Sequence, residues 1–228
     1  MITKNVRILS QIDLEKIAFR VISDYDSTLL QKPQALNVDD FAEKYLKIKL
    51  DYADLSHNGS ILGMMVFSDS SVPAYDPDHD ELFSLDAKAK TALIDRSLLD
   101  EKKASRCRFT ILHECSHWLI HKPLNVEKSI ICRASGPKIE RDWREWQADN
   151  LSSALLMPAA AIYAFMRDYA SKNRKKLEFM YGMYGDRYAR TKRSQIIRLV
   201  GYTFQVSEQA AEVRLAKLGY LKIRENTA

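Results

Sequence analysis

The chain has 228 residues, of which 46% are hydrophobic and 29% are charged, a composition typical of a globular protein and not of a disordered one. Its longest apolar stretch, residues 154–166, is too short to cross a bilayer and contains Pro158. The opening MITKNVRILS lacks the apolar core of a signal peptide, and three cysteines without a CxxC pair fit a reducing compartment, so we expect a cytoplasmic protein with no membrane partner.

The net charge of +5 is unevenly distributed along the chain. Residues 161–228 carry 14 Lys and Arg against 6 Asp and Glu, whereas residues 1–160 carry 21 against 24. A basic C-terminal part on a slightly acidic body suggests an anionic partner for the basic part. A well-solvated basic surface explains the same charge equally well, so charge alone does not decide between the two.

The N-terminal half is predicted to contain two helices and then a small sheet. Ile17, Val21 and Tyr25 recur at helical spacing, and Asn37 is a suitable cap for a second helix that begins with acidic residues. Three segments with alternating or continuous apolar residues are predicted to be strands: residues 47–55, 61–69 and 91–96. The polar, proline-containing segment 68–81 is predicted to be a loop.

The C-terminal half is predicted to be largely helical. A long helix covers about residues 102–121, and an irregular stretch follows over residues 122–140. Another helix runs from about Arg141 to Met157, where Pro158 ends it, and the remainder is also helical. Helices, then a small sheet, then helices are typical of an α+β domain.

The sequence RFTILHECSHWLIH in the long helix contains the spacing of a metal site. Residues four apart lie on one face of a helix, so His113 and His117 can point at a single cation, as in H-E-x-x-H zinc sites. Glu114 projects to the side of that pair. A carboxylate there can take a proton from an activated water molecule and return it to the leaving amine of a peptide.

The five-residue motif alone is a weak signal, because it also occurs by chance in unrelated proteins. The alternative interpretation is a pair of core histidines beside a surface glutamate. However, the neighbours of the motif are uncharged, which predicts a buried helix, and burying two histidines and a glutamate without partners is costly. The metal site is therefore the better interpretation.

A third ligand is needed, and the sequence offers several. His121 continues the same face but lies about 12 Å from His113 along the helix, too far to converge on one ion. Cys115 is two residues from each histidine and turns away from their face, which favours a core position. Glu145 and, one helical turn later, Asp149 fit a thermolysin-like site, with the glutamate on the metal and the aspartate holding the second nitrogen of a ligand histidine; an exposed acidic stripe is the alternative.

Three motifs, in this order, resemble those of the ImmA/IrrE family of metallopeptidases. They are RFTILHECSHWLIH, EWQADNLSSALLMP and FQVSEQAAEVRLAKLGYL. The earlier LNVDDFAEKYLKIKLDYADL and ILGMMVF also stand where that family places a helix and strands, so the resemblance covers about residues 12–221. Cys115 and Ser116 replace the Leu-Gly-type pair usual in the first motif, and Leu151 stands where phenylalanine is common, but none of these is a proposed ligand.

The resemblance implies a zincin-like peptidase domain in which His113, His117 and Glu145 hold one zinc ion. It implies Glu114 as the general base and Asp149 as the outer partner of a ligand histidine. Histidine and glutamate ligands favour zinc, with manganese as the other option. The family's substrate, a helix-turn-helix repressor of a phage, a mobile element or a stress response, is implied by the resemblance alone.

We expect two parts: a zincin-like metallopeptidase domain over residues 1–170, and a basic helical segment over residues 171–228 that packs against it. The second part has the outline of a helix-turn-helix, in which Ser207 caps a helix and Gly219 ends it. A tyrosine from the start of this part would suit the stabilisation of an oxyanion, and the candidates are Tyr181, Tyr184 and Tyr188.

Two functions of other classes compete with the peptidase. One is a zinc-containing module that binds a protein partner without cutting it. The other is a DNA-binding regulator that uses the basic C-terminal helices, among whose basic residues are Arg193, Arg198 and Arg214. Glu208 and Glu212 lie on the helix that would read the bases, where neutral or basic residues are preferred, so DNA binding is not the favoured interpretation.

Overall fold

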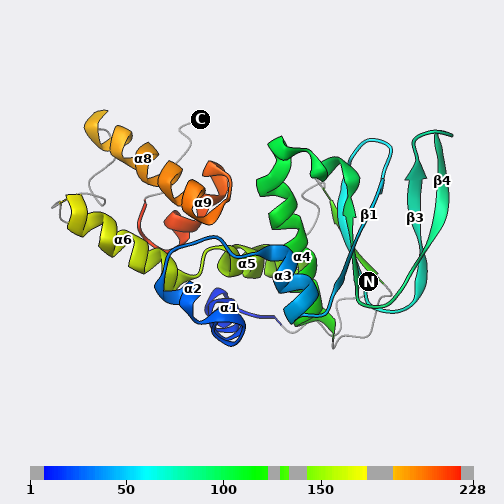
Figure 1. The fold of residues 1–228 in the computed structure, drawn as a ribbon, viewed down its shortest axis with the longest axis horizontal. Coiled ribbons are helices and arrows are strands. Elements are labelled where there is room, and N and C mark those ends of the chain that lie inside the picture. Colours follow the sequence, from blue (N-terminus) through cyan, green and yellow to red (C-terminus); the bar gives the residue numbers. More distant parts are fainter. Residues whose placement is uncertain (1–7, 123–128, 134–142, 174–186, 222–228) are drawn as a thin grey trace. The chain divides into compact units, whose positions relative to one another are not determined.

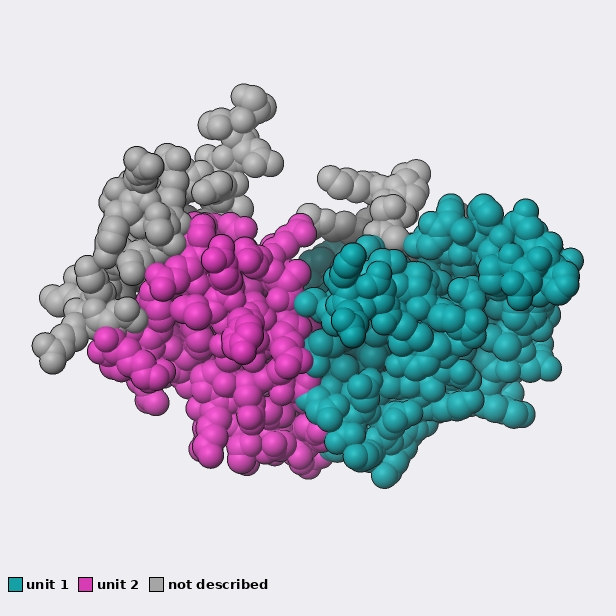
Figure 2. Space-filling model, turned by 45° about the horizontal axis from the view of Figure 1, so that its top comes forward, with its two compact units in different colours: residues 1–17, 37–152 teal, residues 18–36, 153–228 magenta. Residues whose placement is uncertain are grey.

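The computed structural model describes residues 8–122, 129–133, 143–173 and 187–221, and shows helices combined with a small mixed sheet (Figure 1). The predicted α+β fold class is thereby confirmed. The chain forms two compact units: unit 1 comprises residues 1–17 and 37–152, and unit 2 comprises residues 18–36 and 153–228 (Figure 2). The division at residue 170 that the sequence suggested stays a prediction.

The main sheet of unit 1 has four strands in the order β1-β5-β2-β6. The strands are β1 (Lys49–Ala53), β2 (Ile61–Val66), β5 (Thr91–Asp95) and β6 (Ser129–Arg133). β1 runs parallel to β5, whereas β2 is antiparallel to both of its neighbours. Every residue of β5 is buried, as expected for a central strand that is covered on both faces. The three strands predicted from the sequence are confirmed.

The prediction that residues 122–140 are irregular is wrong over β6. Residues Ser129–Arg133 form an edge strand that pairs with β2, and Met64 lies opposite Ile131. The strand is only five residues long, and its apolar run stands between polar residues. So short a strand carries little periodicity of its own and is specified by its pairing with β2.

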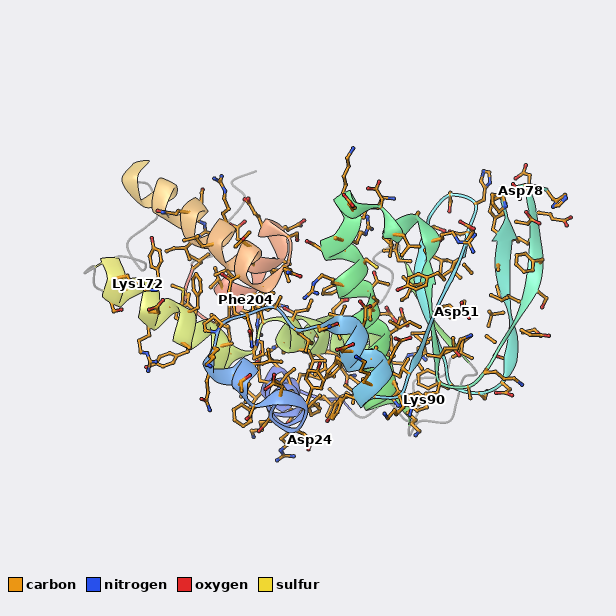
Figure 3. The ribbon with its side chains drawn as sticks, viewed as in Figure 1. Asp24, Asp51, Asp78, Lys90, Lys172 and Phe204 are labelled. Carbon is orange, nitrogen blue, oxygen red and sulfur yellow. The ribbon has the colours of Figure 1, made fainter. Side chains whose placement is uncertain are left out.

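The prediction of a loop over residues 68–81 is also wrong. This segment belongs to a hairpin of β3 (Ser70–Asp76) and β4 (Glu81–Ala87), whose turn carries Asp78 (Figure 3). Val72 and Ala74 are buried, whereas Pro73 between them is exposed, so β3 alternates as a strand should. A two-stranded ribbon needs hydrogen bonds on only one side of each strand, and proline is tolerated where its nitrogen faces away from the partner.

The helix that carries the histidine motif, α4 (Ala104–His121), packs against β2, β5 and β6 (Figure 1). All eight residues from Thr110 to His117 are buried, so the middle of the helix is enclosed on every side. Before the sheet, α3 (Val38–Asp40) is capped by Asn37, whose side chain accepts from the Asp40 N–H at 3.1 Å, as predicted. The chain then continues through one π-helical segment, Phe41–Tyr45.

The other helices lie wholly or partly in unit 2. They are α1 (Gln11–Asp26), α2 (Thr28–Gln31), α5 (Trp143–Leu156), α6 (Ala159–Asn173), α8 (Arg187–Phe204) and α9 (Glu208–Lys217). Ser207 caps α9 by accepting from the Ala210 N–H at 3.1 Å, and Gly219 has φ +79° after its end, as the sequence predicted. Phe204, at the end of α8, is fully buried (Figure 3). None of the helices in the described ranges combines the length and apolar character needed to cross a membrane.

Two basic residues of α8 and α9, Arg193 and Arg214, make buried contacts within unit 2. Arg214 is fully buried, and its Nε donates to the Met157 carbonyl oxygen at 2.9 Å. Arg193 is 6% exposed and donates to Glu212 at 2.6 Å. Arginines that are buried and paired in this way stabilise the helices and cannot contact DNA phosphates without breaking these bonds, which weighs against the DNA-binding alternative.

Candidate metal and catalytic site

Three side chains from α4 and α5 converge in unit 1. The Nε2 atoms of His113 and His117 are 2.9 Å apart, and Glu145 places Oε2 3.2 Å from His113 Nε2 and Oε1 3.3 Å from His117 Nε2. Both histidines are buried, and Glu145 is one-third exposed. Donors about 2.1 Å from a tetrahedral zinc ion lie roughly 3.4 Å apart, so the three residues fit such an ion by number, type and spacing.

The charges of these groups depend on one another. Burial alone would raise the pKa of Glu145, but hydrogen bonds with His113 and His117 outweigh burial and hold that pKa well below its usual value. Burial lowers the pKa of His117, with the hydrogen bond to Glu145 opposing that effect. An ionised carboxylate beside a neutral imidazole is the protonation state that a divalent cation requires of its ligands.

Asp149 contacts the other side of one histidine. Its Oδ1 lies 3.0 Å from His113 Nδ1, and its side chain is 57% exposed. When His113 donates its Nδ1 proton to this carboxylate, the lone pair of the neutral ring is on Nε2 and faces Glu145. The one-turn separation of Glu145 and Asp149 along α5 therefore lets one carboxylate join the converging group while the other orients the imidazole.

Glu114 is fully buried beside this group. Neither carboxylate oxygen has a hydrogen-bond partner among the described residues, and burial raises the pKa of Glu114 to about 8, with nearby His113 opposing the rise. A buried carboxyl group without partners is costly, and a cation next to it would offset that cost by favouring the ionised form. The unsatisfied carboxylate is therefore a second observation that fits a metal in this place.

Space for Glu114 depends on Gly63 in β2. A Cβ atom on Gly63 would lie 2.6 Å from Glu114 Oε1 and 2.8 Å from Thr110 Cγ2, closer than real atoms approach. The pairing of β2 with β6 is irregular between Ile61 and Gly63, the kind of local distortion often found beside active sites. Glycine at this position thus accommodates the close approach of the Glu114 side chain.

The comparison with known families shows the family of the chain. The family model Peptidase_M78, described as the IrrE N-terminal-like domain, matches residues 98–216, just over half of the chain. The chain belongs to this family of metallopeptidases. The match confirms the ImmA/IrrE resemblance drawn from the motifs, and it includes α4 and both acidic residues of α5. A search of the curated proteins found no match.

The structure of this metallopeptidase-family chain places the residues predicted from the sequence as follows. His113, His117 and Glu145 lie together, Glu114 and Asp149 each lie next to that group, and Cys115 is fully buried, as a core residue should be. The tyrosines proposed for the oxyanion cannot be placed, because Tyr181 and Tyr184, and the side chain of Tyr188, lie outside the described residues.

Two further residues were missed. Gly63 lies in a strand far from the motif, and no sequence signal connects it to Glu114. His121 lies outside the converging group, as the sequence predicted, but its ring makes a contact with His117 that the predictions from the sequence do not include. The spacing of four residues between His117 and His121 is a signal that would have found this contact.

Proposed function

We propose that the protein is a zinc-dependent endopeptidase whose substrate is a helix-turn-helix transcriptional repressor. The observation that carries the zinc site is the convergence of the donor atoms of His113, His117 and Glu145 within 4.8 Å of one another. The buried carboxylate of Glu114 beside them supports hydrolysis in particular. The repressor as substrate is supported by the family resemblance.

The chemistry divides between the ion and the chain. When bound, zinc supplies Lewis acidity, which polarises the scissile carbonyl and lowers the pKa of a water molecule toward neutrality. Glu114 takes a proton from the attacking water and passes it to the amide nitrogen, so that the hydroxyl ends on the new carboxyl group and the proton on the new amine. Asp149 holds the His113 ring with Nε2 toward the other two donors.

A place in the reducing cytoplasm is part of the proposal. Cys107 and Cys115 are both free, and burial raises the pKa of each thiol, so neither is poised as a reactive thiolate. Free cysteines fit a compartment in which disulfides do not accumulate. Cytoplasm is also where a transcriptional repressor would be met.

The first test of the proposal is made in cells that contain the natural partners. We expect about one zinc ion per chain in the purified protein, measured by elemental mass spectrometry. We also expect new peptide N termini in a helix-turn-helix protein when the parent is expressed, and not when Glu114→Gln is expressed at the same level. New N termini confined to other classes of protein would overturn the substrate assignment while leaving the peptidase intact.

Gly63→Ala is expected to slow cleavage by roughly 10- to 100-fold without loss of zinc. The added methyl group would overlap Glu114 Oε1, so either the carboxylate or β2 must move, and displacement of a general base by a fraction of an ångström reduces its catalytic effect. Cleavage rate and zinc content are measured on the same preparation.

Gly59→Ala is the matched control for Gly63→Ala. A Cβ atom at Gly59 meets nothing within 4 Å, but its φ of +64° strains alanine by about 1 kcal/mol. The control therefore loses stability without touching Glu114. Equal slowing in both variants would mean that general destabilisation, and not the position of Glu114, limits the rate.

A further inference from the structure

His121 makes a buried contact with His117, one of the three proposed ligands. It lies in the last turn of α4, is 4% exposed, and places its Nδ1 2.8 Å from His117 Nδ1. The other nitrogen of His117, Nε2, faces His113 and Glu145. The two nitrogens of this one ring thus have separate partners, the converging donors on one side and His121 on the other.

The contact restricts the tautomers of both rings. Two Nδ1 atoms at hydrogen-bond distance require one donor and one acceptor. If His121 donated, a neutral His117 would keep its proton on Nε2 and could not offer that nitrogen to a metal. If His117 donates from Nδ1, its Nε2 has a lone pair directed at the converging donors, and His121 carries its own proton on Nε2.

We infer that His121 is a positioning residue, whose Nδ1 accepts the proton of His117 and thereby holds His117 in the tautomer and orientation that bind the metal. This inference rests on the proposed function, because it assumes a metal at His117 Nε2. His121 stands to His117 as Asp149 stands to His113, with each ligand histidine fixed by a partner at its Nδ1.

Exposure explains why one partner is a carboxylate and the other an imidazole. Asp149 is 57% exposed, so its charge remains in contact with water. His121 is buried, and His117 and the neighbouring Glu114 are each fully buried. A carboxylate at residue 121 would have to be desolvated in this buried position, whereas a neutral imidazole accepts the same hydrogen bond without bringing a charge.

The test compares two substitutions of His121 in the full-length chain. His121→Phe keeps a ring but removes the acceptor, and we expect zinc to bind 10- to 100-fold more weakly, the range found when the outer partner of a ligand histidine is lost. His121→Asn places an amide oxygen near the position of Nδ1, and we expect it to restore most of the affinity. Zinc affinity is measured by competition with a chromophoric chelator, and circular dichroism checks that each variant is folded.

His57→Asn is the matched control, because His57 is an exposed histidine in the same unit, and it should leave the zinc affinity unchanged. If His121→Phe binds zinc as tightly as the parent, or if the folded Phe and Asn variants lose zinc affinity equally, the role of His121 is refuted and the metal site itself is not. A parent chain that binds no zinc would instead overturn the metal site, and the inference with it.

A measurement on the parent chain covers the case in which His121→Phe does not fold. Nitrogen-15 NMR of the zinc-loaded parent should show His117 protonated at Nδ1, and His121 protonated at Nε2 with an unprotonated Nδ1. A merely space-filling role for His121 would not fix these tautomers. A His121 ring protonated at Nδ1 in the loaded protein would contradict the inference directly.

Discussion

Glu114→Gln is expected to reduce peptide cleavage by roughly 10²- to 10⁴-fold, the usual contribution of a general base, while the zinc content stays at the parent level. Glutamine has nearly the same shape as glutamate, so it fills the space beside Gly63, but its amide cannot take up a proton at neutral pH. The three converging side chains are untouched. Cleavage rate and zinc content are measured together, so that a lost base is distinguished from a lost metal.

The stability of the metal-free protein provides the control for this variant. Because burial raises the pKa of Glu114 from 4.5 to about 8, the folded chain holds this proton more tightly than the unfolded chain. The free energy of unfolding contributed by Glu114 is therefore fully present below pH 4.5 and is lost as the pH rises through 8, by on the order of a few kcal/mol. Urea unfolding at pH 5 and pH 9 should show this decline in the parent and not in Glu114→Gln.

The outcome also decides between the peptidase and the non-cleaving binding module. A variant that is folded, keeps zinc and still cleaves would remove Glu114 from the role of base. A parent that binds zinc and a repressor protein, yet yields no new N termini in it, would favour the module. Retention of the repressor by inactive Glu114→Gln is what the peptidase proposal expects, since the substitution leaves binding contacts in place.

The proposed site was predictable from the sequence to the extent that it depends on helical periodicity. His113 and His117 are one turn apart on α4, and Glu145 and Asp149 are one turn apart on α5, so each pair is fixed by local geometry. Bringing the two pairs together is a tertiary event, which the need for a third ligand and the family resemblance both suggested but which helical periodicity does not fix. The same periodicity places His121 one turn after His117, which is a signal for their contact that the distance of His121 from His113 does not reveal.

The predictions from the sequence failed where the structure of a residue depends on contacts with another segment of the chain. Pro73 and the surrounding polar residues suggested a loop, because the hairpin partner that pairs with them is a separate segment, β4. Arg193 and Arg214 contributed to the apparent basic surface, since sequence charge does not reveal that an arginine is buried against a carbonyl or a glutamate. The role of Gly63 could not be predicted for the same reason, because it depends on the contact with Glu114 on another element.

Glu145→Ala is expected to weaken zinc binding by more than the 10- to 100-fold typical of an outer partner, because it removes one of three proposed ligands and the only anionic one. Glu145 contacts Nε2 of both His113 and His117, so its loss also leaves the two imidazoles without the carboxylate that lies between them. Zinc per chain after dialysis, and the dissociation constant from chelator competition, measure the effect.

Asp149→Ala is the matched control, because it removes a carboxylate from the next turn of the same helix. Among the described residues, Asp149 contacts the Nδ1 atom of His113, on the side of the ring away from Glu145, so we expect a loss of zinc affinity within the 10- to 100-fold range, smaller than that of Glu145→Ala. A larger loss of zinc affinity in Asp149→Ala than in Glu145→Ala would mean that Asp149 is the ligand and Glu145 the outer partner. Zinc retained in full by Glu145→Ala would place the third ligand outside α5, with a cysteine thiolate as the next donor to substitute, since zinc accepts sulfur as readily as oxygen.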